Sequence, residues 1–198
     1  MAAKLANNIF FFTNALKVLK YLAENPEKEH LGSDVQDAVK ISRAGVYFAL
    51  RDLEKQGLIV KQKKGRGKLL IYKLRNSNPI VRQYKVLNNV LSIENLVEML
   101  KPVSRKVILY GSMARGEDSS ESDIDIFVLS KDTGAARKMI DSYNTGLYSY
   151  LHKMRNIQAV IKTQVEYSTM KEKDKVFCKE VDRGIILWGD EENEHSVR

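Results

Sequence analysis

The sequence predicts an α+β protein made of two small parts, and three observations lead to this fold class. The chain has 198 residues, which allows one large domain or two small ones. Residues 1–102 carry 18 Lys+Arg against 9 Asp+Glu, whereas residues 103–198 carry 15 against 16. Apolar residues at helical spacing dominate the first half, and strand-like apolar runs flank short polar motifs in the second.

Composition excludes several classes of protein. The single cysteine, Cys178, cannot form an internal disulfide or build a Cys-rich zinc site, so we expect a cytoplasmic, reducing setting. No apolar stretch approaches the ~20 residues that span a bilayer, and we expect no membrane partner. Polar residues (Thr13, Asn14, Lys17 and Lys20) interrupt the apolar run at 9–23. The apolar residues of this run keep helical spacing, which indicates a core-facing helix rather than a signal peptide.

The first half reads as helices followed by a hairpin. Ser42 is a good N-cap for the third helix, and Gly57 stands where a left-handed residue ends it. Glycines at 65 and 67 lie in a turn, 63–67, between two strand-like stretches. The expected elements are helices at 9–23, 33–39 and 43–56 and strands at 58–61 and 69–74.

The stretch from Ile41 to Ile59 resembles the recognition region of winged-helix transcription regulators, and the likeness extends over about residues 8–75. It implies a winged helix-turn-helix domain at 1–77 that binds nucleic acid, with duplex DNA as the expected partner. Such a domain inserts the first turn of its recognition helix into the major groove.

Side-chain spacing marks the expected DNA-binding surface. With Val46, Leu50 and Leu53 buried, the opposite face of the helix is exposed. Residues 61–75 hold seven basic side chains and no acid. This composition favours contact with nucleic-acid phosphates over the alternative, a hairpin whose charges only interact with solvent. The DNA-binding candidates are Arg43, Ala44, Tyr47 and Arg51 on the helix and Lys63, Lys64, Arg66 and Lys68 on the hairpin.

Residues 78–102 are expected to connect the two parts. Asn78-Pro79 is typical of a helix start, and Ser92 can begin a second helix. An interdomain packing role and a homodimer contact both remain open for this stretch, and the oligomeric state is not determined by the sequence.

Two short motifs carry the chemistry of the second half. A strand beginning at Lys106 runs into Gly111-Ser112, and after ten intervening residues the chain reads Asp123-Ile124-Asp125. Residues two apart on a strand share a face, so the two carboxylates point the same way. Carboxylates and phosphate oxygens are the ligands that Mg²⁺ prefers, and a glycine turn admits a phosphate closely.

This pair of motifs resembles the signature of the DNA polymerase beta-like nucleotidyltransferases, above all the minimal nucleotidyltransferase group, over about residues 103–189. The resemblance implies a small nucleotidyltransferase-fold α/β domain at 103–198 with a short mixed sheet. It also implies that Gly111 and Ser112 hold a nucleoside triphosphate and that Arg115 neutralises phosphate charge. Asp123 and Asp125 would be the catalytic residues and ligands of a Mg²⁺ pair, which promotes transfer of a nucleoside monophosphate to an acceptor.

The family's third carboxylate has no evident counterpart. The resemblance places it on a later strand, here 156–163, where Gln158 stands at the aligned position. The nearest acid is Glu166, and Thr163-x-x-Glu166 fits a capping box that begins the next helix. Both a structural and a catalytic role for Glu166 remain open, so turnover is uncertain.

The remaining expectations complete the second half. They are a helix at 135–154, a helix at 165–182 with Tyr167, Val176, Phe177 and Val181, a strand at 185–189 and an acidic tail at 190–194.

Three functions follow from these expectations. The first is a DNA-binding, Mg²⁺-dependent nucleotidyltransferase. The second is a winged-helix transcriptional regulator whose transferase-like domain senses a nucleotide without catalysis. The third is an antitoxin-type nucleotidyltransferase paired with a toxin. The sequence does not reveal the nucleotide, the acceptor or the preferred DNA sequence.

Overall fold

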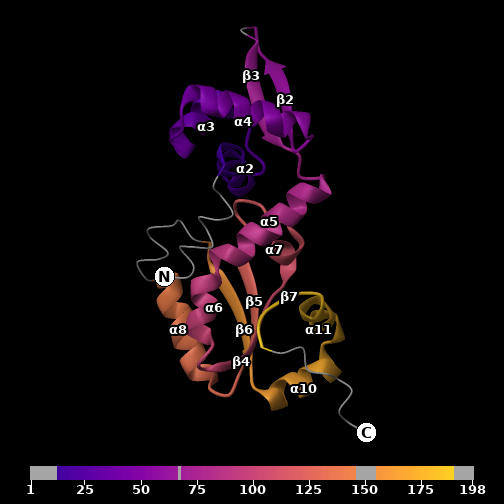
Figure 1. The fold of residues 1–198 in the computed structure, drawn as a ribbon. Helices are drawn as coiled ribbons and strands as arrows, with labels where there is room; N and C mark the ends of the chain where they lie inside the picture. The colour runs from indigo at the N-terminus through magenta and orange to yellow at the C-terminus, as the bar shows by residue number, and fades with distance from the viewer. Residues whose placement is uncertain (1–12, 67, 146–154, 190–198) are drawn as a thin grey trace. The chain divides into compact units, whose positions relative to one another are not determined.

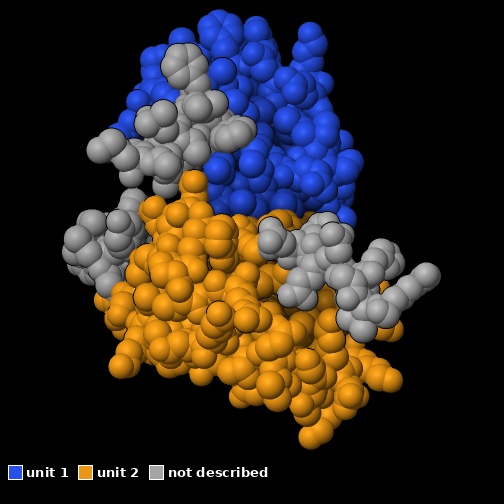
Figure 2. Space-filling model, turned by 60° about the horizontal axis from the view of Figure 1, so that its bottom comes forward, with its two compact units in different colours: residues 1–91, 116–121 blue, residues 92–115, 122–198 orange. Residues whose placement is uncertain are grey.

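The computed structural model describes residues 13–66, 68–145 and 155–189. The chain divides into two compact units, which Figure 2 colours separately. Unit 1 comprises Met1–Leu91 and Gly116–Glu121, and unit 2 comprises Ser92–Arg115 and Ser122–Arg198. The predicted α+β class is confirmed, as is the small mixed sheet of the second half.

Unit 1 packs helices on a three-stranded antiparallel sheet of order β1-β3-β2 (Figure 1). Its core gathers Val18 and Leu22 with Val46, Leu50 and Leu53. The elements are α2 (Asn14–Glu24), β1 (His30–Leu31), α3 (Gly32–Val39), α4 (Arg43–Lys55), β2 (Ile59–Lys64), β3 (Leu69–Leu74) and α5 (Pro79–Ser92).

Local signals predicted most of unit 1. The Ser42 hydroxyl accepts a hydrogen bond from the Gly45 amide at 3.1 Å, so the predicted N-cap of α4 is confirmed. Gly57 adopts the expected positive φ of 70°. The predicted strand 58–61 is too short, because β2 continues through Lys63 and Lys64, which pair with β3. The first helix is described from Asn14 onward, so residues 9–12 lie outside the described residues.

Unit 2 is a four-stranded mixed sheet of order β6-β5-β4-β7 with helices on both faces. Strands β5 and β6 run parallel, and the other neighbours are antiparallel. The elements are α6 (Glu94–Leu100), β4 (Ser104–Leu109), α7 (Gly111–Arg115), β5 (Ile124–Ser130), α8 (Thr133–Thr145), β6 (Ile157–Lys162), α10 (Gln164–Lys173), α11 (Lys175–Asp182) and β7 (Ile185–Trp188).

The helices of unit 2 form two layers. Helices α6 and α8 lie together on one side of the sheet, and α10 and α11 lie on the other (Figure 1). On the α11 side, Phe127 of β5 packs with Phe177 and Val181. Since residues two apart share a strand face, Asp125 lies on the same face as Phe127, beyond the edge of this apolar cluster.

The prediction of one continuous helix at 165–182 is wrong. Asp174 leaves helical geometry, with φ −127° and ψ 71°, and its carboxylate accepts from the Phe177 amide at 3.0 Å. An aspartate that caps a new helix ends the preceding one, so α10 and α11 are separate. Val176 then falls on the outer face of α11 and is 83% exposed.

The predicted helix at 135–154 begins earlier, at Thr133, and is described to Thr145, whereas 146–154 and the tail at 190–194 lie outside the described residues. No helix among the residues that the structure describes is long and apolar enough to cross a membrane.

Candidate active site

The two predicted carboxylates meet at the start of β5. Asp125 is the second residue of the strand, and its carbonyl accepts a hydrogen bond from the Tyr110 amide at 3.0 Å. Asp123 stands just before the strand. The parallel register sets Asp125 beside Gln158 of β6, and the Gln158 amide nitrogen donates to the Asp123 carboxylate. Both aspartates and Gln158 therefore occupy one end of the sheet.

Gly111 joins the Gly-Ser motif to these carboxylates. It has a φ of 72°, and a Cβ placed there would lie 3.2 Å from the Asp125 carboxyl carbon and closer still to one of its oxygens. A side chain at this position would displace Asp125, so only glycine lets β4 turn into α7 so close to the carboxylate. The structure thus brings Gly111 of the Gly-Ser motif next to Asp125 of the Asp-x-Asp motif.

The electrostatics of this cluster favour a cation. Burial, and then the negative charge of Asp123, raise the pKa of Asp125 above its usual value, and Arg115 partly offsets this effect. Burial and the charges of Asp125 and Glu180 raise the pKa of Tyr110 to about 12. Two neighbouring carboxylates repel each other when both are ionised, and a bound cation relieves that repulsion.

Gln158 and Glu166 lie at opposite ends of β6. Gln158 is beside Asp125, at the position where the family resemblance places a third carboxylate. Glu166 follows the other end of the strand, and its carboxylate accepts from the Thr163 amide at 2.7 Å. The Thr163 hydroxyl accepts from the Glu166 amide, so the predicted capping box is confirmed. The Thr163 amide and the Thr163 hydroxyl both donate to the Glu166 carboxylate, and these two hydrogen bonds hold the pKa of Glu166 below its usual value.

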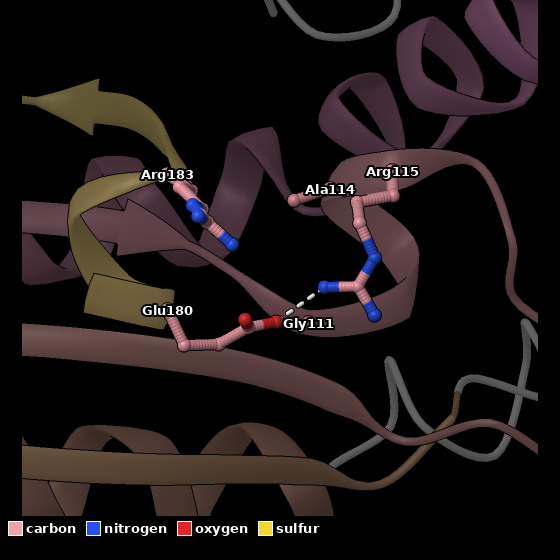
Figure 3. Close-up of a pocket in the computed structure, with 6 residues that line it drawn as sticks. Gly111, Ala114, Arg115, Glu180 and Arg183 are labelled. Carbon is pink, nitrogen blue, oxygen red and sulfur yellow. Dashed lines mark hydrogen bonds and ion pairs between the residues drawn. The ribbon is translucent and has the colours of Figure 1, made fainter. Parts of the chain in front are cut away.

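A hollow of about 220 Å³ opens beside the Gly-Ser motif (Figure 3). Arg115 forms an ion pair with Glu180 there, and the Arg183 side chain extends into the same space. Its lining residues are Gly111, Ala114, Arg115, Glu180, Arg183 and Gly184.

Sequence reasoning missed Glu180 and Arg183. Pairing of β7 with β4 sets the end of α11 beside α7, although these segments lie about 65 residues apart in the chain. No local pattern in the sequence signals that approach. In the described ranges, no group of three or more His, Cys, Asp or Glu side chains gathers that could hold a metal.

The predicted DNA-binding residues are exposed on unit 1. On α4, Tyr47 is 60% exposed and packs edge-on against Phe48, with their ring centroids 5.5 Å apart. The Arg51 guanidinium lies over the Phe48 ring, 4.9 Å from its centroid. Phe48 was not among the predicted contacts. The predicted residues whose side chains are exposed are Arg43, Ala44, Tyr47, Arg51, Lys63, Lys64, Arg66 and Lys68.

Acidic residues from outside the basic hairpin pair with two of its lysines. The Lys64 ammonium lies 2.6 Å from a Glu29 carboxylate oxygen, and Lys61 lies 3.5 Å from Glu54. Neither acid belongs to the hairpin, so its local composition overstates the positive charge that this surface offers.

Comparisons with known proteins identify the family of the second half of the chain by a family model. A family model described as polymerase beta, nucleotidyltransferase matches residues 92–193. A crystal structure of a candidate nucleotidyltransferase from Sulfolobus solfataricus has 18% sequence identity and a TM-score of 0.36, over 56% of this chain and 89% of that one. No curated protein matches the chain. The family model covers half of the chain, including both motifs, and the protein therefore belongs to the polymerase beta nucleotidyltransferase family.

Proposed function

We propose that this protein binds duplex DNA and transfers a nucleoside monophosphate from a nucleoside triphosphate to an acceptor. The observation that carries the proposal is the contact of Gly111 with Asp125, because it unites the Gly-Ser and Asp-x-Asp motifs in one site. The proposed division is a winged helix-turn-helix domain at 1–77, connecting helices at 78–102 and a catalytic domain at 103–198.

The triphosphate has a basic hollow to enter. Gly111 and Ser112 offer backbone groups and a hydroxyl, and Arg115 and Arg183 supply two positive charges beside them. An arginine recognises phosphate oxygens through its fork of N–H donors. Arg115 is paired with Glu180, so we propose that the phosphates compete with this carboxylate for the guanidinium.

The donor set fits a hard divalent cation. Asp123 and Asp125 supply carboxylate oxygens on one side of the sheet, and phosphate oxygens complete the preferred ligands of Mg²⁺. When bound there, Mg²⁺ neutralises charge on the transferring phosphate. Gln158 contributes no charge to this set, so a second metal ion would have to depend on the phosphates for most of its ligands.

The proposed transfer step is a substitution at the α-phosphorus. An acceptor oxygen forms a bond to the α-phosphorus, and the bond from that phosphorus to the oxygen bridging to the β-phosphate breaks. Pyrophosphate leaves with the electron pair. The proton of the acceptor passes to water, because the amide of Gln158 cannot take it. Without a positioned base, the step is expected to be slow.

The test is direct transfer of label. The full chain is incubated with Mg²⁺ and each of ATP, GTP, CTP and UTP labelled at the α-phosphate. Label on protein, duplex DNA, RNA or a small acceptor supports the proposal, and Asp125→Asn must abolish it. Label retained by that variant, or no transfer from any nucleotide, would overturn the enzymatic function.

DNA binding rests on the exposed face of α4 and the hairpin. Changing Lys63, Lys64 and Arg66 to Ala should weaken binding to every duplex and make affinity less steep in salt, by about 0.9 in the logarithmic slope per lost phosphate contact. Changing Arg43 or Tyr47 should instead alter sequence preference. Absence of duplex binding by the full chain at low salt would refute this part of the proposal.

A nucleotide sensor is the second candidate, and Gln158 is the observation that favours it. A site that keeps the phosphate motif and two aspartates but lacks a third carboxylate can bind Mg²⁺ and nucleotide without rapid turnover. Its signature would be an effect of the nucleotide on DNA affinity in the absence of any label transfer.

A further inference from the structure

The segment 116–121 joins the two halves of the proposed nucleotide site. Helix α7, which carries Gly111 and Ser112, ends at Arg115, and Asp123 follows two residues after Glu121. By its contacts, however, this segment belongs to unit 1, whereas the motifs on either side of it belong to unit 2. The chain therefore leaves unit 2 and returns to it between the Gly-Ser and Asp-x-Asp motifs.

A buried ion pair holds the middle of this segment to α5. The Lys85 ammonium lies 3.4 Å from an Asp118 carboxylate oxygen, with side-chain exposures of 3% and 1%. The ammonium also donates to the Asp118 carbonyl, and the Asn89 side chain donates to the same carboxylate at 3.0 Å. Hydrogen bonds that satisfy a buried ion pair fix its geometry.

Further contacts fasten the two ends. Gly116 has a φ of 66°, and a Cβ there would lie 2.8 Å from the Arg82 carbonyl carbon, so its backbone rests directly on α5. Arg82 also pairs with Glu117 at 3.6 Å. Near the other end, the Ser120 amide donates to Glu27 at 3.4 Å. The whole segment is thus attached to unit 1.

This attachment restricts how far the segment 116–121 can move. Asp118 lies three residues after the end of α7 and six before the start of β5. Helix α5 is itself fixed in the core of unit 1, because Val81 is fully buried with Leu50 and Leu53 of α4. A shift of Asp118 would therefore pass along a short connection to Gly111 on one side and to Asp123 on the other.

We propose that Lys85 and Asn89 are positioning residues for the nucleotide site. By holding Asp118 they fix the segment 116–121, and the segment sets how the Gly-Ser and Asp-x-Asp motifs face each other. The inference rests on the proposed function for its meaning, but the positioning itself is a property of the protein without nucleotide.

The decisive variant is the double change Lys85→Met with Asp118→Leu. Loss of one partner alone leaves a buried charge and can unfold unit 1, whereas replacing both by apolar side chains avoids this. Asn89→Leu is a milder second variant of similar volume. Tyr84→Phe is the matched control, since it removes a hydrogen bond that the same helix makes to the Leu16 carbonyl.

Amide hydrogen exchange of the full chain without ligands gives the first readout. Peptides covering 107–115 and 122–127 should exchange at least several-fold faster in the double variant and in Asn89→Leu than in wild type or Tyr84→Phe, at equal midpoints of urea unfolding. Unchanged exchange in those peptides would overturn the proposal, whatever the protein does with nucleotides.

Binding of ATP, GTP, CTP and UTP with Mg²⁺, measured by calorimetry, gives the second readout. The double variant should bind the tightest of the four roughly tenfold more weakly than wild type, with Tyr84→Phe unchanged. Equal affinity in variant and wild type would overturn the proposal. Absence of binding in wild type would refute the proposed function instead, and hydrogen exchange would still decide the positioning role.

Discussion

Asp118 and the pair Asp123 and Asp125 lie within eight residues of one another in the chain but have opposite electrostatic environments. Asp118 is buried against Lys85 and Asn89, so its charge is matched inside unit 1. Asp123 and Asp125 lie beside each other at the end of a sheet, where the pKa of Asp125 is raised by burial and by its neighbour. A matched charge stabilises the fold, whereas mutually repelling carboxylates at an accessible site are available to a cation.

Adding a third carboxylate beside Asp123 and Asp125 is expected to have the largest effect. Gln158→Asp places an acid beside Asp125, where it can take the acceptor proton and bind metal, so single-turnover transfer of labelled NTP should rise by ~10²–10⁴. Gln158→Asn is the matched control, because asparagine has the same side-chain length as aspartate and no charge. Equal rates in the two variants would show that position 158 lies outside the chemistry.

Glu166 provides the contrasting control for that experiment. It caps α10 through Thr163, at the far end of β6. Glu166→Gln should therefore slightly lower the midpoint of thermal unfolding and leave transfer unchanged. Loss of transfer in this variant would make Glu166 the third catalytic carboxylate.

Breaking the buried ion pair of Lys85 with Asp118 should strongly destabilise the fold. Lys85→Met leaves Asp118 buried without its cation, and the free energy of unfolding should fall by about 3–5 kcal/mol. Adding Asp118→Leu should recover this loss in urea unfolding. A single variant as stable as wild type would mean that Asp118 is not held as a buried charge.

The repelling pair should respond to pH in the opposite sense from an ordinary ion-paired aspartate. The pKa of Asp125 is raised in the folded state, so the folded protein binds its proton more tightly than the unfolded chain does. Asp125 therefore costs stability above its folded pKa, and this cost is relieved as pH falls through that value. In metal-free buffer, Asp125→Asn should gain stability at pH 7 and lose that advantage in acid, as measured by thermal unfolding.

The smallest effect is expected at the hairpin, where a paired charge can be released. Glu29 neutralises Lys64, so Glu29→Gln should strengthen duplex binding at low salt, by no more than about fivefold. Val176→Gln, on the exposed face of α11, is a control that leaves the charge of this surface unchanged. Weaker binding in Glu29→Gln would show that Lys64 needs Glu29 for its position.

The parts of the fold that the sequence predicts are those with local causes. Ser42 caps α4 within three residues, Gly57 ends it with a positive φ, and the apolar spacing of Val46, Leu50 and Leu53 defines its buried face. Asp123 and Asp125 lie close together because they are two residues apart at the start of β5. Each of these features depends on residues that are neighbours in the chain.

The features that the sequence does not predict arise from long-range contacts or from competing local ones. Arg115 meets Glu180 across 65 residues, and Lys85 meets Asp118 across 33. Such pairs depend on topology, which no local spacing encodes. The break at Asp174 is different in kind, because there a capping hydrogen bond outweighs apolar spacing that continues on both sides.

Cooperative binding of metal and nucleotide tests the central claim most directly. Calorimetry of the full chain with ATP, GTP, CTP and UTP, each with and without Mg²⁺, measures whether each ligand strengthens binding of the other. Since Asp123 and Asp125 would share a cation with the phosphates, wild type should show this mutual strengthening, and Asp123→Asn and Asp125→Asn should lose it while remaining folded. Equal nucleotide affinity with and without Mg²⁺ in wild type would contradict the account.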